Sequence, residues 1–187
     1  MVHLLAAREY RPDASPLFYA ANLAPDCIDI REIKDKTHFR ILTPDERAEA
    51  LRDLRDRSMG KGDLAEGLFL HLFLDREWDA IMSGGMWGRF PGPEGFLNYR
   101  AEIRNLSRSL FREDPKGEEM WASIEALSPE SYAEHPDFPA KEIRKFILYN
   151  ADRHRNGECI PPEVFTLDFT RAFIRETVEK FKRFINE

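Results

Sequence analysis

Apolar side chains recur at alternating intervals of three and four residues along much of this chain, and this spacing constrains its fold more than any other feature. The clearest run consists of Phe96, Tyr99, Ile103, Leu106 and Leu110. At 3.6 residues per turn, these side chains line one side of an α-helix, which must bury that side against other elements. The spacing therefore predicts a helix here, together with further helices for it to pack on.

Two later stretches show the same pattern. Apolar residues within 143–150 and 169–185 fall on one helical face in each case. Gly157 follows the first stretch by a few residues, where a left-handed residue often ends a helix. We expect both stretches to be helices and Gly157 to cap the first.

Capping residues predict two more helices. Thr43 offers an N-cap, the following proline suits the first turn, and Glu46 can return to the cap. This predicts a helix over 44–58. A similar start at Asp114 predicts a helix that runs through Leu127.

The apolar run 68–74 fits either a buried strand or a buried helix. Helical spacing continues from it to Met82, which favours a helix. Shorter β-prone stretches at 2–5, 28–33 and 38–42 predict a small sheet formed by N-terminal segments.

Composition fits one folded domain. The 187 residues include 42% hydrophobic and 12% aromatic residues, enough for a sizeable core. The predicted fold class is therefore mainly α, a compact single-domain multi-helix bundle spanning residues 1–187, with the small sheet as an addition.

Charge and cysteine usage narrow the classes of function. The net charge of −6 argues against nonspecific nucleic-acid binding, which needs an excess of Lys and Arg. Cys27 and Cys159 lack zinc-ligand spacing and fit a reducing cytoplasm. The longest apolar stretch, 64–74, is far shorter than the roughly 20 residues that span a bilayer. We expect a soluble cytoplasmic protein with no membrane partner; its oligomeric state stays open.

Two histidines are candidates for acid/base chemistry. His71 lies in an apolar run, and Asp75 lies one helical turn later, so the carboxylate could hold the ring as a base or a metal ligand. No second ligand motif accompanies them, so we predict no metal and no cofactor; a core histidine satisfied by hydrogen bonds is the alternative. His154 precedes Cys159, but a helix C-terminus disfavours the thiolate that a Cys-His pair would need.

The segment 83–95 holds five of the ten glycines and two prolines, which predicts a shaped loop. Trp87, Arg89 and Phe90 are its candidate binding residues, because aromatic and arginine side chains dominate binding hot spots. The alternative is that its aromatic side chains fold back onto the core.

Arginines recur at every fourth position of the 96–110 helix and just beyond it. Arg100, Arg104 and Arg108 form a ridge that could bind an anion. Acidic residues at the same interval in 45–53 offer an intramolecular pairing instead. Exposed ion pairs are worth only about 0 to 1 kcal/mol, so charge alone does not decide between these readings.

These features lead to two functional hypotheses. The first is a binding or regulatory module, of the inhibitor, immunity or accessory type, that contacts a protein or small-molecule ligand through the 83–95 loop. The alternative is a small hydrolase or transferase with a pocket under that loop, a histidine acid/base and arginines for an anionic substrate. Whether the chain is an enzyme stays open on sequence grounds.

Overall fold

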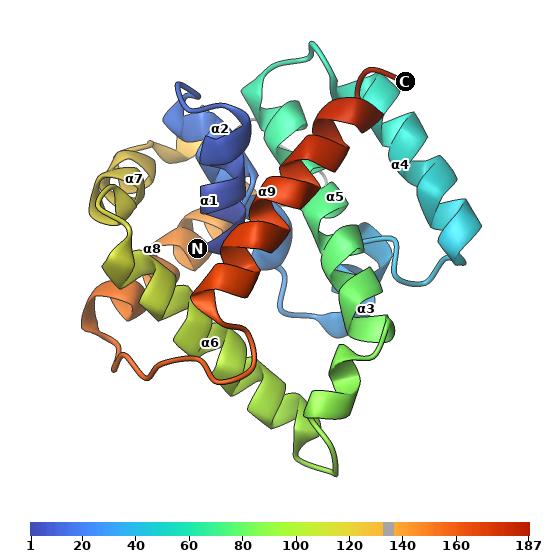
Figure 1. Cartoon of the computed structure of the whole chain (residues 1–187). Coiled ribbons are helices and arrows are strands. Elements are labelled where there is room, and N and C mark those ends of the chain that lie inside the picture. Colours follow the sequence, from blue (N-terminus) through green and yellow to red (C-terminus); the bar gives the residue numbers. More distant parts are fainter. Residues whose placement is uncertain (133–136) are drawn as a thin grey trace.

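The computed structural model describes residues 1–132 and 137–187, and within them the chain is helical, with no β-strand. Figure 1 shows the helices crossing one another around a shared interior. The elements in chain order are α1 (Val2–Tyr10), α2 (Pro16–Ala21), the 3-10 turn η1 (Ala24–Cys27), α3 (Arg31–Thr37), α4 (Pro44–Ser58), α5 (Asp63–Ser83), η2 (Met86–Arg89), α6 (Gly95–Glu113), α7 (Gly117–Glu125), η3 (Pro129–Ser131), α8 (Ala140–Asn156) and α9 (Leu167–Phe184).

Helix α5 forms the centre of the fold. It contacts α1, α2, α4 and α9, and every residue from 67 to 74 is buried. Neighbours on all sides explain why this run shows no amphipathic face. The prediction of a helix here is confirmed.

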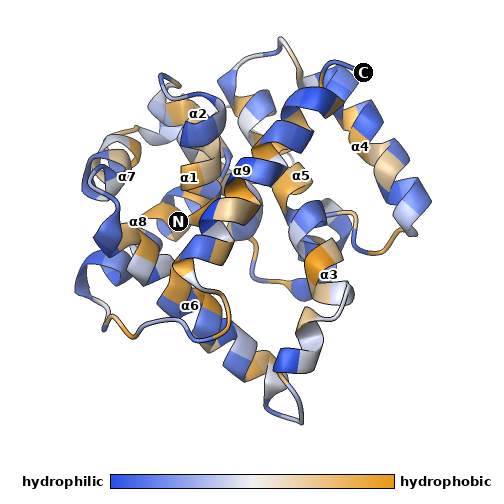
Figure 2. Ribbon diagram, in the orientation of Figure 1, coloured by the Kyte–Doolittle hydropathy of each residue, from blue (hydrophilic) through white to orange (hydrophobic). Residues whose placement is uncertain are grey.

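The outer helices turn their apolar faces inward, as the orange and blue sides of the ribbons in Figure 2 show. The capping box at Thr43 forms as expected, and α4 has the predicted bounds. Helix α9 begins at a Thr166 cap and buries Phe173, Val178 and Phe181. Helical spacing and capping residues therefore predicted these elements well.

The predicted N-terminal sheet is wrong. Residues 2–5 lie in α1, 28–30 link η1 to α3, 31–33 are the first turn of α3, and 38–42 form the turns after it. A run of four to six β-prone residues suits a strand only where a second strand pairs with it. Here α1 instead packs against α9, α2 and α5, so its apolar residues are buried as a helix.

Smaller corrections concern helix ends. The helix after Asp114 begins at Gly117 and ends at Glu125, two residues short of the predicted end. Gly157 follows α8 but has φ −73°, so it is not a left-handed cap. Among the described residues, no helix is both long enough and apolar enough to cross a membrane.

Candidate metal centre

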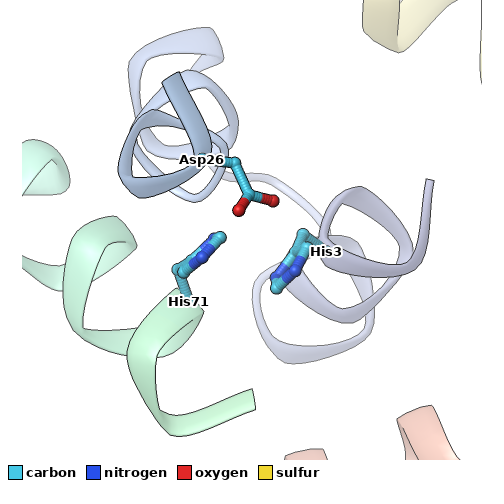
Figure 3. A group of neighbouring side chains, drawn as sticks. All are labelled: His3, Asp26 and His71. Atoms are coloured by element: carbon cyan, nitrogen blue, oxygen red, sulfur yellow. The ribbon is translucent and has the colours of Figure 1, made fainter. Parts of the chain in front are cut away.

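Five potential metal ligands from four segments meet beside the buried middle of α5. His71 and Asp75 lie one turn apart on α5, so they share a face. His3 comes from the first turn of α1, Asp26 from η1, and His38 directly follows α3. Figure 3 shows His3, Asp26 and His71 as neighbours that come from three different segments. Two overlapping groups, His3 with Asp26 and His71, and His38 with His71 and Asp75, each bring their ligand atoms within 4.8 Å of one another.

A close approach of α2 to α5 positions His71. A Cβ atom on Gly67 would lie 2.6 Å from the Phe18 carbonyl oxygen and 2.7 Å from the Ala21 Cβ atom, so only glycine fits. This packing brings the carbonyl oxygen of Asn22 within 2.9 Å of His71 Nδ1. The His71 ring is therefore held by the end of α2, which can approach α5 this closely only because residue 67 is glycine.

The hydrogen bonds of His38 and His71 fix where their protons lie. His71 Nδ1 donates to the Asn22 carbonyl, and His38 Nδ1 donates to the Lys34 carbonyl at 2.8 Å. A carbonyl oxygen can only accept, so both Nδ1 atoms carry hydrogen and both Nε2 atoms of the neutral rings present lone pairs. Those Nε2 atoms face each other at 3.2 Å. Two facing lone pairs repel unless a proton or a metal ion lies between them.

The carboxylates complete a ring of donors. Asp75 lies 3.4 Å from His3 Nε2, 3.5 Å from His38 Nε2 and 3.9 Å from His71 Nε2. Asp26 lies 3.9 Å from His38 Nε2. His3 is stacked on His71 with ring centroids 4.0 Å apart, and its buried Nδ1 has no hydrogen-bond partner among the described residues. Nitrogen and oxygen donors at these separations suit a first-row divalent ion.

The ionisation states favour cation binding. Burial lowers the pKa of His71 to about 3 and also lowers that of His38, so both rings are neutral near pH 7. Burial opposes ionisation of Asp75, yet its pKa lies well below its ordinary value, with a hydrogen bond from His3 among the causes. Asp26 is likewise ionised despite burial, because Lys34 lowers its pKa. Neutral imidazoles and ionised carboxylates are the forms that bind metals.

Charged residues outside the ring orient the carboxylates. Arg40 donates to Asp75 at 2.8 Å and to Asp79 at 2.9 Å. Lys34 pairs with Asp26. Such outer contacts fix the orientation of ligating carboxylates in metal proteins.

One side of the centre is open to water. The side chains of Asp26, His3 and Asp75 are 27%, 18% and 13% exposed, whereas those of His38 and His71 are fully buried. A separate shallow hollow between α5 and α9, lined by residues that include Ile81 and Phe173, contains none of the five donors.

The structure brings together two of the sequence candidates and separates the third. His71 and Asp75 both belong to the centre. His154 is buried elsewhere, with Nε2 2.9 Å from Ser107 Oγ and its ring against Trp121. Burial lowers its pKa to about 3, so it is a neutral core histidine.

The 83–95 loop and the arginine ridge contribute none of the five donors. Trp87 is 43% exposed and Arg89 is also exposed, but Phe90 is only 8% exposed and packs on Phe165. Phe90 therefore fits the alternative of a loop aromatic folded back onto the core.

Among the described residues, the arginine ridge makes no intramolecular charge pairs. Within the described parts of the chain, no ion pair joins Arg100, Arg104 or Arg108 to the acidic residues of 45–53. Arg108 instead donates to the carbonyl groups of Arg153 and Glu158. The charge pairing suggested by the two ridges in the sequence does not form.

His3, Asp26 and His38 were not predicted from the sequence as site residues, so the cluster of potential ligands that they form with His71 and Asp75 was missed. These residues are separated from His71 by 33 to 68 positions and follow no ligand motif. The available signal was that His38 and His3 are two of only five histidines and that Asp75 follows His71 by one turn. That signal could indicate a ligand pair, but only the fold shows which other segments complete it.

Comparison of the chain with protein-family models, with curated proteins and with solved structures gives no match.

Proposed function

We propose that this protein binds a first-row divalent metal ion, zinc in the first instance, through His38, His71 and Asp75, with His3 as a further ligand and Asp26 beside the position left for water, and uses it for hydrolysis. The observation that carries the proposal is the 3.2 Å approach of two Nε2 atoms whose rings already donate through Nδ1 to backbone carbonyls. An ion between the rings removes this repulsion, and the adjacent carboxylates balance its charge.

The donor set favours a catalytic over a structural role. Structural zinc sites are closed and are usually rich in cysteine, whereas catalytic sites use histidine and carboxylate ligands and leave a position for water. Neither Cys27 nor Cys159 is among the donors here, and the Asp26 side of the ring is open. Zinc lowers the pKa of a bound water to about 7, which supplies a nucleophile at neutral pH. An Asp26 carboxylate that does not ligate the ion could accept the proton of that water.

The charges around the opening indicate the kind of substrate. Lys34 and Arg40 are 30% and 29% exposed beside the carboxylates that they orient. Two cations and a metal ion would favour a substrate with negative charge near the bond that is cleaved. We therefore propose a hydrolase for anionic esters. This agrees with the sequence-based alternative of a small hydrolase with an anionic substrate, but the site lies beside α5 and not under the 83–95 loop.

Metal analysis of the purified protein tests this proposal. We expect about one zinc equivalent after purification without chelator and dialysis against zinc, measured by mass spectrometry, and hydrolysis of anionic chromogenic esters that depends on it. His38→Gln and Asp75→Asn should lose both. His154→Gln is the matched control, because it changes a buried histidine outside the centre, and it should retain both. A folded wild-type protein that takes up no divalent ion would refute the metal centre.

A binding role for the 83–95 loop is the second candidate. Its support is reduced, since Phe90 is buried and only Trp87 and Arg89 remain available to a protein or small-ligand partner. Retention of metal-dependent hydrolysis by a Trp87→Ala, Arg89→Ala variant would separate the loop from the chemistry.

A further inference from the structure

A face built from α6 and α8 combines unpaired arginines with exposed apolar side chains. This arginine-aromatic face consists of Phe96, Leu97, Arg100, Arg104, Tyr149 and Arg153. Leu97, Arg100 and Arg104 follow one another at helical spacing along α6. In Figure 1, the N-terminal end of α6 and the loop before it form the lower tip of the molecule.

The arginines from the two helices lie close together. Burial and the neighbouring Arg153, Arg100 and Arg108 lower the pKa of Arg104, and Tyr149 acts in the opposite direction. Arg153 stacks on the Tyr149 ring at 5.2 Å, and Arg100 lies 6.0 Å from the Phe96 ring centroid. Helix α8 therefore adds a cation and an aromatic ring to the cationic ridge of α6.

Within the part of the chain that the structure describes, these arginines have no carboxylate partner. Arginines elsewhere in the protein form ion pairs, for example Arg155 with Glu118 and Glu125. No described carboxylate forms an ion pair with Arg100, Arg104 or Arg153. On a chain of net charge −6, a cluster of unpaired like charges is a local exception that an external anion would stabilise.

Apolar side chains on the same face are unusually exposed. Leu97, Tyr149 and Phe96 are 64%, 57% and 52% exposed. Trp87 is 43% exposed and its ring lies 4.9 Å from that of Tyr99, one turn from Phe96, so it extends the apolar part of the tip. Leucine, phenylalanine and tryptophan beside arginine are the residues that enter the headgroup region of a bilayer.

We propose that the arginine-aromatic face docks this protein on the surface of an anionic lipid bilayer. Arg100, Arg104 and Arg153 contact headgroup phosphates, and Leu97, Phe96 and Trp87 enter the acyl boundary. Single-stranded nucleic acid could contact the arginines and the aromatic rings of this face. It would leave Leu97, the most exposed apolar side chain of the face, without an apolar partner, whereas a lipid bilayer supplies one. This peripheral contact departs from the sequence-based expectation of no membrane partner, and it does not depend on the metal centre.

Vesicle flotation tests the proposal directly. We expect the full chain to float with vesicles that contain phosphatidylserine and to bind pure phosphatidylcholine vesicles much more weakly, with added salt reducing the difference. Trp87 should be quenched by lipids brominated along the acyl chain, and a Trp87→Phe variant should lose that signal. This second readout needs no change to the arginine-aromatic face itself.

Paired variants separate the two components of binding. Arg100→Gln with Arg104→Gln should weaken binding to anionic vesicles about 25-fold, at about fivefold for each arginine. Leu97→Ser should weaken it about tenfold. Arg52→Gln on α4 and Ile41→Ser, at a site 66% exposed on another segment, are the matched controls and should have no effect. All variants should keep the helical circular dichroism and metal content of the wild type.

Three outcomes would overturn the proposal. The first is no flotation of the wild type with anionic vesicles. The second is equal loss of binding in the control variants. The third is tight, salt-dependent binding of a labelled single-stranded oligonucleotide that Arg104→Gln abolishes, without any vesicle binding. The first two exclude lipid docking by this face, and the third assigns the arginines to nucleic acid instead.

Discussion

Replacing Gly67 by alanine tests whether the close approach of α2 and α5 positions the metal centre. The new Cβ atom would lie 2.6 Å from the Phe18 carbonyl oxygen, and ordinary contact begins at 3.4 Å, so α2 must move by about 0.8 Å. Overpacking of this kind costs about 1 to 3 kcal/mol, and alanine returns up to about 1 kcal/mol through its higher helix propensity. With the full gain subtracted, we expect a net loss of about 0 to 2 kcal/mol in the free energy of unfolding.

The same movement should weaken metal binding. Asn22 is the C-cap residue of α2, and its carbonyl accepts the His71 Nδ1 hydrogen bond at 2.9 Å. A shift of this size stretches the bond beyond its useful length. Loss of such an outer contact typically lowers metal affinity about 10-fold to 100-fold.

Two assays separate these effects. Urea unfolding followed by circular dichroism, in the presence of chelator, gives the stability of the metal-free protein. Zinc titration calorimetry gives the affinity. Gly88→Ala is the control, since a Cβ atom there meets no atom within 4 Å. If Gly67→Ala keeps both the wild-type stability and the wild-type affinity, the proposed link between helix packing and His71 is wrong.

Three further predictions address the metal, a buried histidine and a loop anchor. Zinc at 100 times its dissociation constant should stabilise the wild type by about 2.7 kcal/mol, and Asp75→Asn should abolish this gain in thermal unfolding with and without chelator. The pKa of His154 is about 3 in the folded protein and 6.5 when unfolded, so its contribution to the free energy of unfolding is present above pH 6.5 and is lost as the pH falls toward 3. Between pH 7 and pH 5 the wild type should lose about 2 kcal/mol more stability than His154→Gln, measured by urea unfolding. Equal losses of stability in the two proteins would contradict this assignment. Glu102 accepts the backbone amides of Val164 and Phe165 at 2.5 and 2.9 Å, so Glu102→Ala should cost about 1 to 3 kcal/mol in the same assay, whereas exposed Glu94→Ala should cost little.

Local rules in the sequence determined most helices of this protein. Thr43 and Glu46 begin α4 because they satisfy free amides of its first turn, a contact between neighbours in the chain. The alternating spacing of Phe96 to Leu110 predicts α6 for a similar reason, since the period of a helix is a local property. These predictions held because they needed no knowledge of what the helices pack against.

Tertiary packing decided the features that depend on distant neighbours. Residues 2–5 suit a strand in isolation, but α9 and α5 are the surfaces available to them, so they form a helix. The apolar run 68–74 is buried on every side because other helices surround it, which no period could reveal.

The candidate metal centre shows the same division most clearly. The sequence placed His71 and Asp75 one turn apart, and that spacing alone made them a candidate pair. His3, Asp26 and His38 join them only because α1, η1 and the turn that follows α3 meet at the middle of α5. A ligand set spread over 73 residues has no fixed spacing, since its geometry is set by how helices pack and not by the bonds between neighbouring residues.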